Sequence, residues 1–150
     1  MTNQEKLGTL GEDLFVHLFG GEKSKDKFDT TKDILSKEGW TIEVKTQNRH
    51  QTAATFTIGS MSHLNNLLKC MVVDRLIFVE YDHTDTIKIW EVQDRKDYII
   101  YKIHPSQRFP QGLTMVGYSI SKMSLLDSHV DGHLAQQMRD LSQSAVFRKK

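Results

Sequence analysis

The chain has 150 residues, of which 38% are apolar and 26% are charged, with only two prolines. This length and composition predict one soluble globular domain over residues 1–150, because a second core would need more residues and disordered chains are poorer in apolar ones. The formal net charge of +1 gives no indication of nucleic-acid binding, which usually accompanies a clearly basic domain.

The sequence also limits the location and the kinds of site. No segment reaches the roughly 18 uninterrupted apolar residues that a membrane-spanning helix needs, and the first residues lack the apolar run of a signal peptide. We therefore expect a cytoplasmic protein with no membrane partner. The single cysteine, Cys70, excludes an internal disulfide and a cysteine-rich zinc site, and its apolar helical surroundings predict an inert thiol. Lysines gather in residues 23–37, but such a cluster is at least as typical of a solvated surface as of a phosphate-binding one.

The first predicted element is a helix over residues 3–19. Thr2 is its expected N-cap and Gly20 follows its end. Its core-facing stripe comprises Leu7, Leu10, Leu14, Phe15 and Leu18. Gly8 and Gly11 beside that stripe predict a close backbone approach to a neighbouring element.

Five strands and one helix are predicted between residues 33 and 92. The helix covers residues 60–71 and lies between the third and fourth strands. The fourth strand is a continuous apolar run typical of a sheet centre, and the fifth alternates well enough to pair with it across a turn at residues 82–85. The predicted strands cover residues 33–36, 40–46, 55–58, 76–79 and 86–92.

The remaining third of the chain is predicted to be mainly helical. Asp94 is the expected cap of a short helix to residue 101, followed by a loop over residues 104–112. An edge strand is predicted at residues 114–120, and a helix with a break near residue 131 at residues 121–144. The element order predicts an α/β fold with a mixed central sheet and flanking helices.

The turn at residues 37–39 sets the register of the first predicted hairpin. A three-residue loop with glycine in its last position is a common hairpin closure. In that register Ile34 faces Ile42, and Asp33 falls directly opposite Glu43 with Cβ atoms roughly 5 Å apart on one face. The sequence therefore predicts two opposed carboxylates.

Two opposed carboxylates require a cation or a shared proton. Oxygen ligands favour Mg²⁺ or Mn²⁺ over zinc, and strand alternation puts Lys45 on the face of Glu43. The opposite, packed face is expected to receive Trp40, Ile42 and Val44. Mg²⁺ polarises a phosphoryl oxygen and activates water, and Lys45 could orient the nucleophile or stabilise charge on phosphorus. The pattern thus favours phosphodiester hydrolysis.

Asp33, nine residues and then Glu43-Val44-Lys45 resemble the core motif of the PD-(D/E)XK nuclease superfamily. The resemblance covers about residues 7–80 and implies a restriction-endonuclease-like core of order αβββαβ. It implies that Asp33, Glu43 and the Val44 carbonyl bind Mg²⁺, with Mn²⁺ as a substitute, and that Lys45 is catalytic. The position before Asp33 is Lys32, where the motif has proline, a departure shared by many active members.

Further residues are assigned by the same resemblance. Glu12, in the first helix, matches an acidic residue that many members place near the metal, and Gln47 matches a glutamine of some branches. Both therefore join the expected catalytic set, and Glu12 is also an expected metal ligand. Glu12 could equally be a solvated helix residue, and Gln47 an ordinary strand-end residue. Lys32, Arg49 and His50 are the expected DNA contacts, although lone basic residues in loops are usually solvated.

The expected function is a Mg²⁺-dependent endodeoxyribonuclease of homing, restriction-like or junction-resolving type, of a size that suits a phage or mobile-element enzyme. DNA is the expected partner, and a homo-oligomer is expected because symmetry helps one small domain to cut two strands. Residues 3–92 would supply the catalytic core, and residues 93–150 DNA recognition or oligomerisation. A ribonuclease with this site, and an inactive nucleic-acid-binding module in which the three charged residues form a structural ion network, remain alternatives.

Overall fold

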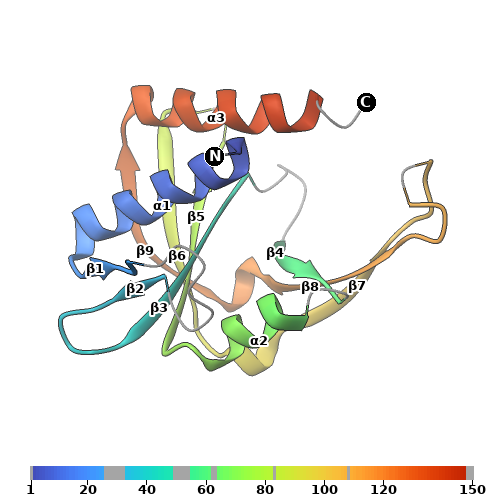
Figure 1. Ribbon diagram of the computed structural model, residues 1–150, viewed down its shortest axis with the longest axis horizontal. Coiled ribbons are helices and arrows are strands. Elements are labelled where there is room, and N and C mark those ends of the chain that lie inside the picture. The colour runs from blue at the N-terminus through green and yellow to red at the C-terminus, as the bar shows by residue number, and fades with distance from the viewer. Residues whose placement is uncertain are drawn as a thin grey trace.

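The computed structural model describes residues 2–25, 33–48, 55–61, 64–82, 84–107 and 109–147. These residues form two β-sheets and three α-helices (Figure 1). The predicted α/β class with a mixed sheet is confirmed. No helix in the described part of the chain is both long enough and apolar enough to cross a membrane.

The larger sheet has six strands in the order β1-β2-β3-β5-β6-β9. β3 and β5 are parallel, and every other neighbouring pair is antiparallel. Its strands are β1 (Glu22–Lys23), β2 (Ile34–Leu35), β3 (Thr41–Gln47), β5 (Arg75–Tyr81), β6 (Thr86–Val92) and β9 (Met123–Val130). The sheet is therefore mixed because a crossover connection follows the β2–β3 hairpin.

The smaller sheet has the antiparallel order β4-β8-β7. Its strands are β4 (Thr55–Ser60), β7 (Ile99–Ile103) and β8 (Leu113–Ser119). The β7–β8 hairpin extends away from the rest of the molecule (Figure 1). The helices are α1 (Asn3–Phe19), α2 (Leu64–Val72) and α3 (Gly132–Phe147), with single 3-10 turns η1 (Arg95–Asp97) and η2 (Ile120–Lys122).

Two hydrophobic clusters cover the two faces of the larger sheet. One contains α1 and α3, and the other contains α2 and strands β4 and β8 of the smaller sheet (Figure 1). In β5, Ile77 and Val79 belong to the first cluster, whereas Leu76 and Phe78 belong to the second. The continuous apolar run of this strand follows from burial on both faces. Cys70 is buried in the second cluster, where burial raises the pKa of its thiol to about 12.

α1 has the bounds that the sequence predicts. Thr2 Oγ1 accepts a hydrogen bond from Glu5 N at 3.1 Å, and Gly20, with φ of 82°, donates to Val16 O at 2.8 Å. Gly11 is buried against Thr46 of β3, as expected of a close approach. Gly8 has no neighbouring atom near its missing Cβ, so the same expectation is wrong for Gly8.

Three predictions for the C-terminal third are wrong. Residues 123–130 form β9 and not a helix, and β8 is the central strand of its sheet and not an edge. The short helix expected up to residue 101 is only the turn η1, although Asp94 does cap it by accepting from Lys96 N at 2.9 Å. β9 pairs with β6, β8 pairs with both β4 and β7, and β7 pairs with β8, so strand pairing supplies the backbone hydrogen bonds that the local pattern assigns to a helix or to solvent.

The predicted division of the chain into a core of residues 3–92 and an addition of residues 93–150 does not follow the packing. β9 pairs with β6 along its whole length, and Ala135 and Met138 of α3 lie fully buried in the cluster beneath α1. These C-terminal elements therefore belong to the core of the larger sheet. The added part lies between them and β6 and consists of β7 and β8 with their turns.

Candidate functional site

The β2–β3 hairpin has the predicted turn and register. Ser36 N donates to Trp40 O at 2.9 Å, Gly39 N donates to Ser36 O at 3.0 Å, and Gly39 has φ of 88°, which favours glycine. Ile34 pairs with Ile42, which places the preceding and following residues, Asp33 and Glu43, opposite one another.

The face opposite Glu43 differs from its prediction at one residue. Ile42 and Val44 lie in the cluster under α1, as expected. Trp40 is 49% exposed, and its ring lies near the guanidinium of Arg75, whose Cζ is 5.9 Å from the ring centroid. The prediction that Trp40 packs into the core is wrong because the residue lies at the start of the hairpin return, before β3 begins at Thr41.

Asp33 is held in place by backbone groups of β3. Its N–H donates to Ile42 O at 2.9 Å, and its Oδ2 accepts from Val44 N at 3.0 Å. Its carboxyl group also lies close enough to that of Glu43 for each group to shift the pKa of the other. The structure thus brings the two predicted acidic residues together.

Lys69 of α2 lies against both carboxylates. Its Nζ is 2.7 Å from Asp33 Oδ1 and 3.1 Å from Glu43 Oε2. The side chains of Lys69 and Asp33 are each only 14% exposed, and that of Glu43 only 5%. Glu43 Oε2 has no hydrogen bond within the described residues, so the lysine contact is an ion pair without hydrogen-bond geometry.

These contacts shift the two carboxyl groups in opposite directions. Burial raises the pKa of Glu43 to about 8, and the neighbouring Asp33 adds to the shift. Burial also acts to raise the pKa of Asp33, but hydrogen bonds with Glu43, Lys69 and Val44 N together hold it below its usual value. Asp33 is therefore the more acidic member of the pair, and Glu43 is the member that binds a proton more readily.

α1 places Glu12 half-buried and close enough to sense this pair. Burial first, and the charge of Asp33 second, raise the pKa of Glu12 to about 7, whereas Lys23 and Lys69 oppose the shift. The carboxyl group of Glu12 is therefore partly withdrawn from solvent. A neighbouring acid, Asp13, is exposed and pairs with Lys23 at 2.9 Å.

Lys45 lies on the Glu43 face of β3, as predicted. Its Nζ donates to Asn66 Oδ1 at 2.6 Å, and Asn66 Nδ2 donates to Ile58 O at 3.2 Å. The charge of Lys45 acts to lower the pKa of Glu43. Lys45 therefore lies beside the carboxylates, but its ammonium is bound by Asn66 of α2, which is itself hydrogen-bonded to β4.

Gln47 joins the two sheets. Its Nε2 donates to Thr57 O at 2.8 Å, and its Oε1 accepts from Thr57 N at 2.9 Å. The Thr57 hydroxyl is hydrogen-bonded in turn to that of Tyr101 on β7. Both polar groups of the Gln47 amide are thus hydrogen-bonded to the backbone of Thr57, and these bonds fix the position of β4 beside the site.

The sequence interpretation missed Lys69 and Asn66. These residues are three positions apart on α2 and therefore share one face of the helix. That spacing of a lysine and an amide, next to the buried stripe of Leu67 and Cys70, is the signal that could have found them. The predicted DNA contacts Lys32, Arg49 and His50 lie outside the described residues.

The donor set fits a hard divalent cation. Asp33 and Glu43 offer carboxylate oxygens, Val44 offers a carbonyl, and Glu43 Oε2 is a buried acceptor without a hydrogen bond among the described residues. Within the described ranges no three His, Cys, Asp or Glu side chains are grouped as a metal site. Mg²⁺ needs fewer, since one or two carboxylates suffice when waters and substrate oxygens complete its shell.

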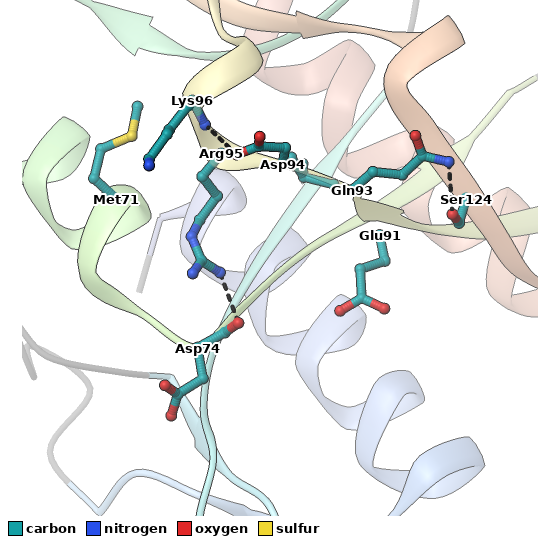
Figure 2. Close-up of a pocket in the computed structure, with 9 residues that line it drawn as sticks. Met71, Asp74, Glu91, Gln93, Asp94, Arg95, Lys96 and Ser124 are labelled. Carbon is teal, nitrogen blue, oxygen red and sulfur yellow. Dashed lines mark hydrogen bonds between the residues drawn. The ribbon is translucent and has the colours of Figure 1, made fainter.

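A cavity of about 630 Å³ lies between the end of α2 and the end of β6, apart from the carboxylates. Figure 2 shows Arg95 reaching across it toward Asp74, whose carbonyl accepts from Arg95 Nη1 at 2.6 Å. Its lining mixes acidic and basic side chains, with Glu91 and Lys96 on opposite sides (Figure 2). Glu91 is itself paired with Arg75 at 2.6 Å, so this cavity presents no single charge to a ligand.

Comparison with known proteins finds no family model that matches this chain and no curated protein that matches its sequence.

Proposed function

We propose that this protein is a Mg²⁺-dependent nuclease that hydrolyses phosphodiester bonds of DNA at Asp33, Glu43 and Lys45. The observation that carries the proposal is the cross-strand pair of carboxylates, Glu43 buried and Asp33 largely so, with an ammonium on the same face of β3. A nearly buried like-charge pair is costly unless a cation or proton compensates it. Carboxyl groups whose pKa values are strongly shifted by burial and a charged partner cluster at functional sites.

The residues of the chain have separate tasks in this proposal. Asp33 and Glu43, with the Val44 carbonyl, would hold Mg²⁺, and the hydrogen bond from Val44 N aims the Asp33 carboxylate. When bound, Mg²⁺ supplies Lewis-acid polarisation of the phosphoryl oxygen and a more acidic water. Lys45, held by Asn66, presents its ammonium to the negative charge that develops on the phosphoryl group.

Glu12 and Gln47 extend the site on either side. The Glu12 carboxyl, with a pKa of about 7, can exchange a proton near neutral pH, which is what general acid–base catalysis requires. Gln47 acts as a positioning residue, because it fixes Thr57 and hence β4 next to Lys45. We assign neither residue to the essential pair of metal ligands.

The connectivity around the pair supports a restriction-endonuclease-like core. The β2–β3 hairpin is followed by a crossover through α2 to the parallel strand β5, with α1 on the opposite face. Counting only the larger sheet, the order is α1, strands β1, β2 and β3, helix α2 and strand β5, which corresponds to the helix, three strands, helix, strand order of the resemblance. The strand expected third, β4, precedes α2 but belongs to the smaller sheet. We further propose that the substrate is DNA and that a homo-oligomer cuts both of its strands.

The test is a cleavage panel of linear, supercoiled and branched DNA and of matched RNA, each with and without Mg²⁺ or Mn²⁺. Cleavage should require metal and should be lost in Asp33→Asn and Lys45→Ala variants that keep their circular dichroism spectrum and melting temperature. Asp13→Asn is the matched control, because it removes an exposed acid of α1 and should leave cleavage unchanged. Absence of metal-dependent cleavage of every substrate by the wild-type protein would refute the proposal.

Lys69 favours one alternative, a nucleic-acid-binding module without turnover. In that module Lys69 would be the permanent counter-ion of Asp33 and Glu43, and the cluster would be a structural ion network. The two functions differ in metal binding, which the module does not need. Calorimetric titration of Mg²⁺ or Mn²⁺ into the wild-type protein and the Asp33→Asn variant separates them.

A further inference from the structure

We propose that Lys69 is an internal competitor of the metal, and that a divalent cation enters the site by displacing its ammonium from Asp33 and Glu43. This inference rests on the proposed function, because it assumes that the two carboxylates bind metal. It adds a residue outside the expected motif that sets the metal affinity of the site. It also assigns two conformations to the Lys69 side chain, one without metal and one with it.

Both oxygens of Asp33 are in use without metal. Oδ2 accepts from Val44 N at 3.0 Å, and Oδ1 is 2.7 Å from Lys69 Nζ. The backbone bond is fixed by the register of the hairpin, whereas the lysine lies at the end of a flexible four-carbon chain. A cation held by Asp33 would therefore compete with the ammonium for Oδ1, and the ammonium is the group that is free to leave.

The same ammonium faces the second ligand. Lys69 Nζ lies 3.1 Å from Glu43 Oε2, the buried oxygen without a hydrogen bond. A cation bridging both carboxylates would need the space that the ammonium occupies, and two cations this close in a half-buried site repel strongly. While Lys69 stays in place, binding of one cation by both carboxylates would thus be strongly disfavoured.

The other lysine of the site has a different relation to the carboxylates. Lys45 Nζ is bonded to Asn66 Oδ1 at 2.6 Å and makes no ion pair with Asp33 or Glu43 among the described residues. Lys45 therefore repels a metal only through space, whereas Lys69 also occupies its ligands. This difference provides a control with the same change of charge.

The experiment is calorimetric titration of Mg²⁺ and Mn²⁺ alone into wild type, Lys69→Met, Lys45→Met and Lys102→Met. Lys69→Met should bind metal about ten- to a hundredfold more tightly than wild type. Lys45→Met should change the affinity by only a few-fold, and Lys102→Met, at an exposed position of β7, should leave it unchanged. Adding Asp33→Asn to Lys69→Met should abolish the gain.

The titrations distinguish failure of the Lys69 displacement from failure of the metal site itself. If Lys69→Met binds metal no more tightly than Lys45→Met, the displacement is refuted while a metal site remains. If neither wild type nor folded Lys69→Met binds metal, the proposed function and the displacement both fail.

A second measurement uses the wild-type protein and depends on no variant. Amine acetylation followed by mass spectrometry should show faster modification of Lys69, whose side chain is 14% exposed without metal, when Mg²⁺ is saturating. Lys102 provides the internal reference rate. An unchanged rate at Lys69 in the presence of bound metal overturns the displacement.

Discussion

Gly11 lies where α1 comes closest to β3. A Cβ at this position would be 1.8 Å from Thr46 Oγ1 and 3.0 Å from Thr46 Cβ, well inside van der Waals contact. Overpacking of this kind costs about 1–3 kcal/mol, and the better helix propensity of alanine offsets about 1 kcal/mol. With a contact this short we expect the upper end of the range, so Gly11→Ala should lower the free energy of unfolding by about 2 kcal/mol.

Gly8 provides the matched control for Gly11→Ala. No atom lies within 4 Å of a Cβ at Gly8, so Gly8→Ala should stabilise the protein by up to about 1 kcal/mol. Urea denaturation followed by circular dichroism measures both changes. Thr46→Ala removes the contacting hydroxyl, which is itself buried without a hydrogen bond among the described residues, and should recover most of the loss in the double variant. Equal stability of the two alanine variants, or additivity of Gly11→Ala and Thr46→Ala, would refute the close approach.

Three further predictions concern polar groups near the site. Burial and a neighbouring carboxylate raise the pKa of Glu43 from 4.5 to about 8. Between these two pH values the folded protein retains a proton that the unfolded chain releases. The free energy of unfolding therefore falls as pH rises from 4.5 to about 8. Glu43→Gln removes this loss, so in urea denaturation its stability relative to wild type should rise from about pH 5 to about pH 8 and then level off. Asn66→Ala removes the acceptor of Lys45 Nζ, and kcat for DNA cleavage should fall about tenfold, while calorimetry shows unchanged metal affinity. Gln47→Ala leaves both backbone groups of Thr57 without their partners, and the free energy of unfolding should fall by about 1–3 kcal/mol in urea denaturation.

The opposed acids could be predicted from the sequence because their arrangement depends on local chemistry. Gly39 specifies the loop, the loop specifies the register, and the register brings Asp33 and Glu43 together across only nine residues. Lys69 could not be placed in this way. It is 36 positions from Asp33, and its contact depends on how α2 docks against the sheet, which no local pattern specifies.

β9 shows why another part of the fold escaped prediction. Met123, Leu126 and Val130 have the three- and four-residue spacing of a helix face. In the sheet, Trp90 pairs with Leu125 and Ile89 with Asp127, so Leu126 is an extra residue in a β-bulge. The bulge interrupts the alternation that marks a strand, and pairing with β6 outweighs the local helical signal.

If the site binds metal as proposed, the contact between Lys69 and the carboxylates allows the chain to fold before metal binds. The Lys69 ammonium neutralises the Asp33 carboxylate as the two groups become buried. The hairpin and α2 can therefore pack together at any concentration of free divalent cation. A metal site without such an internal cation often depends on the ion for its folded state. Here the newly made protein would reach its folded form first and take up its cofactor afterwards, so removal of metal by a chelator should abolish activity without unfolding the chain.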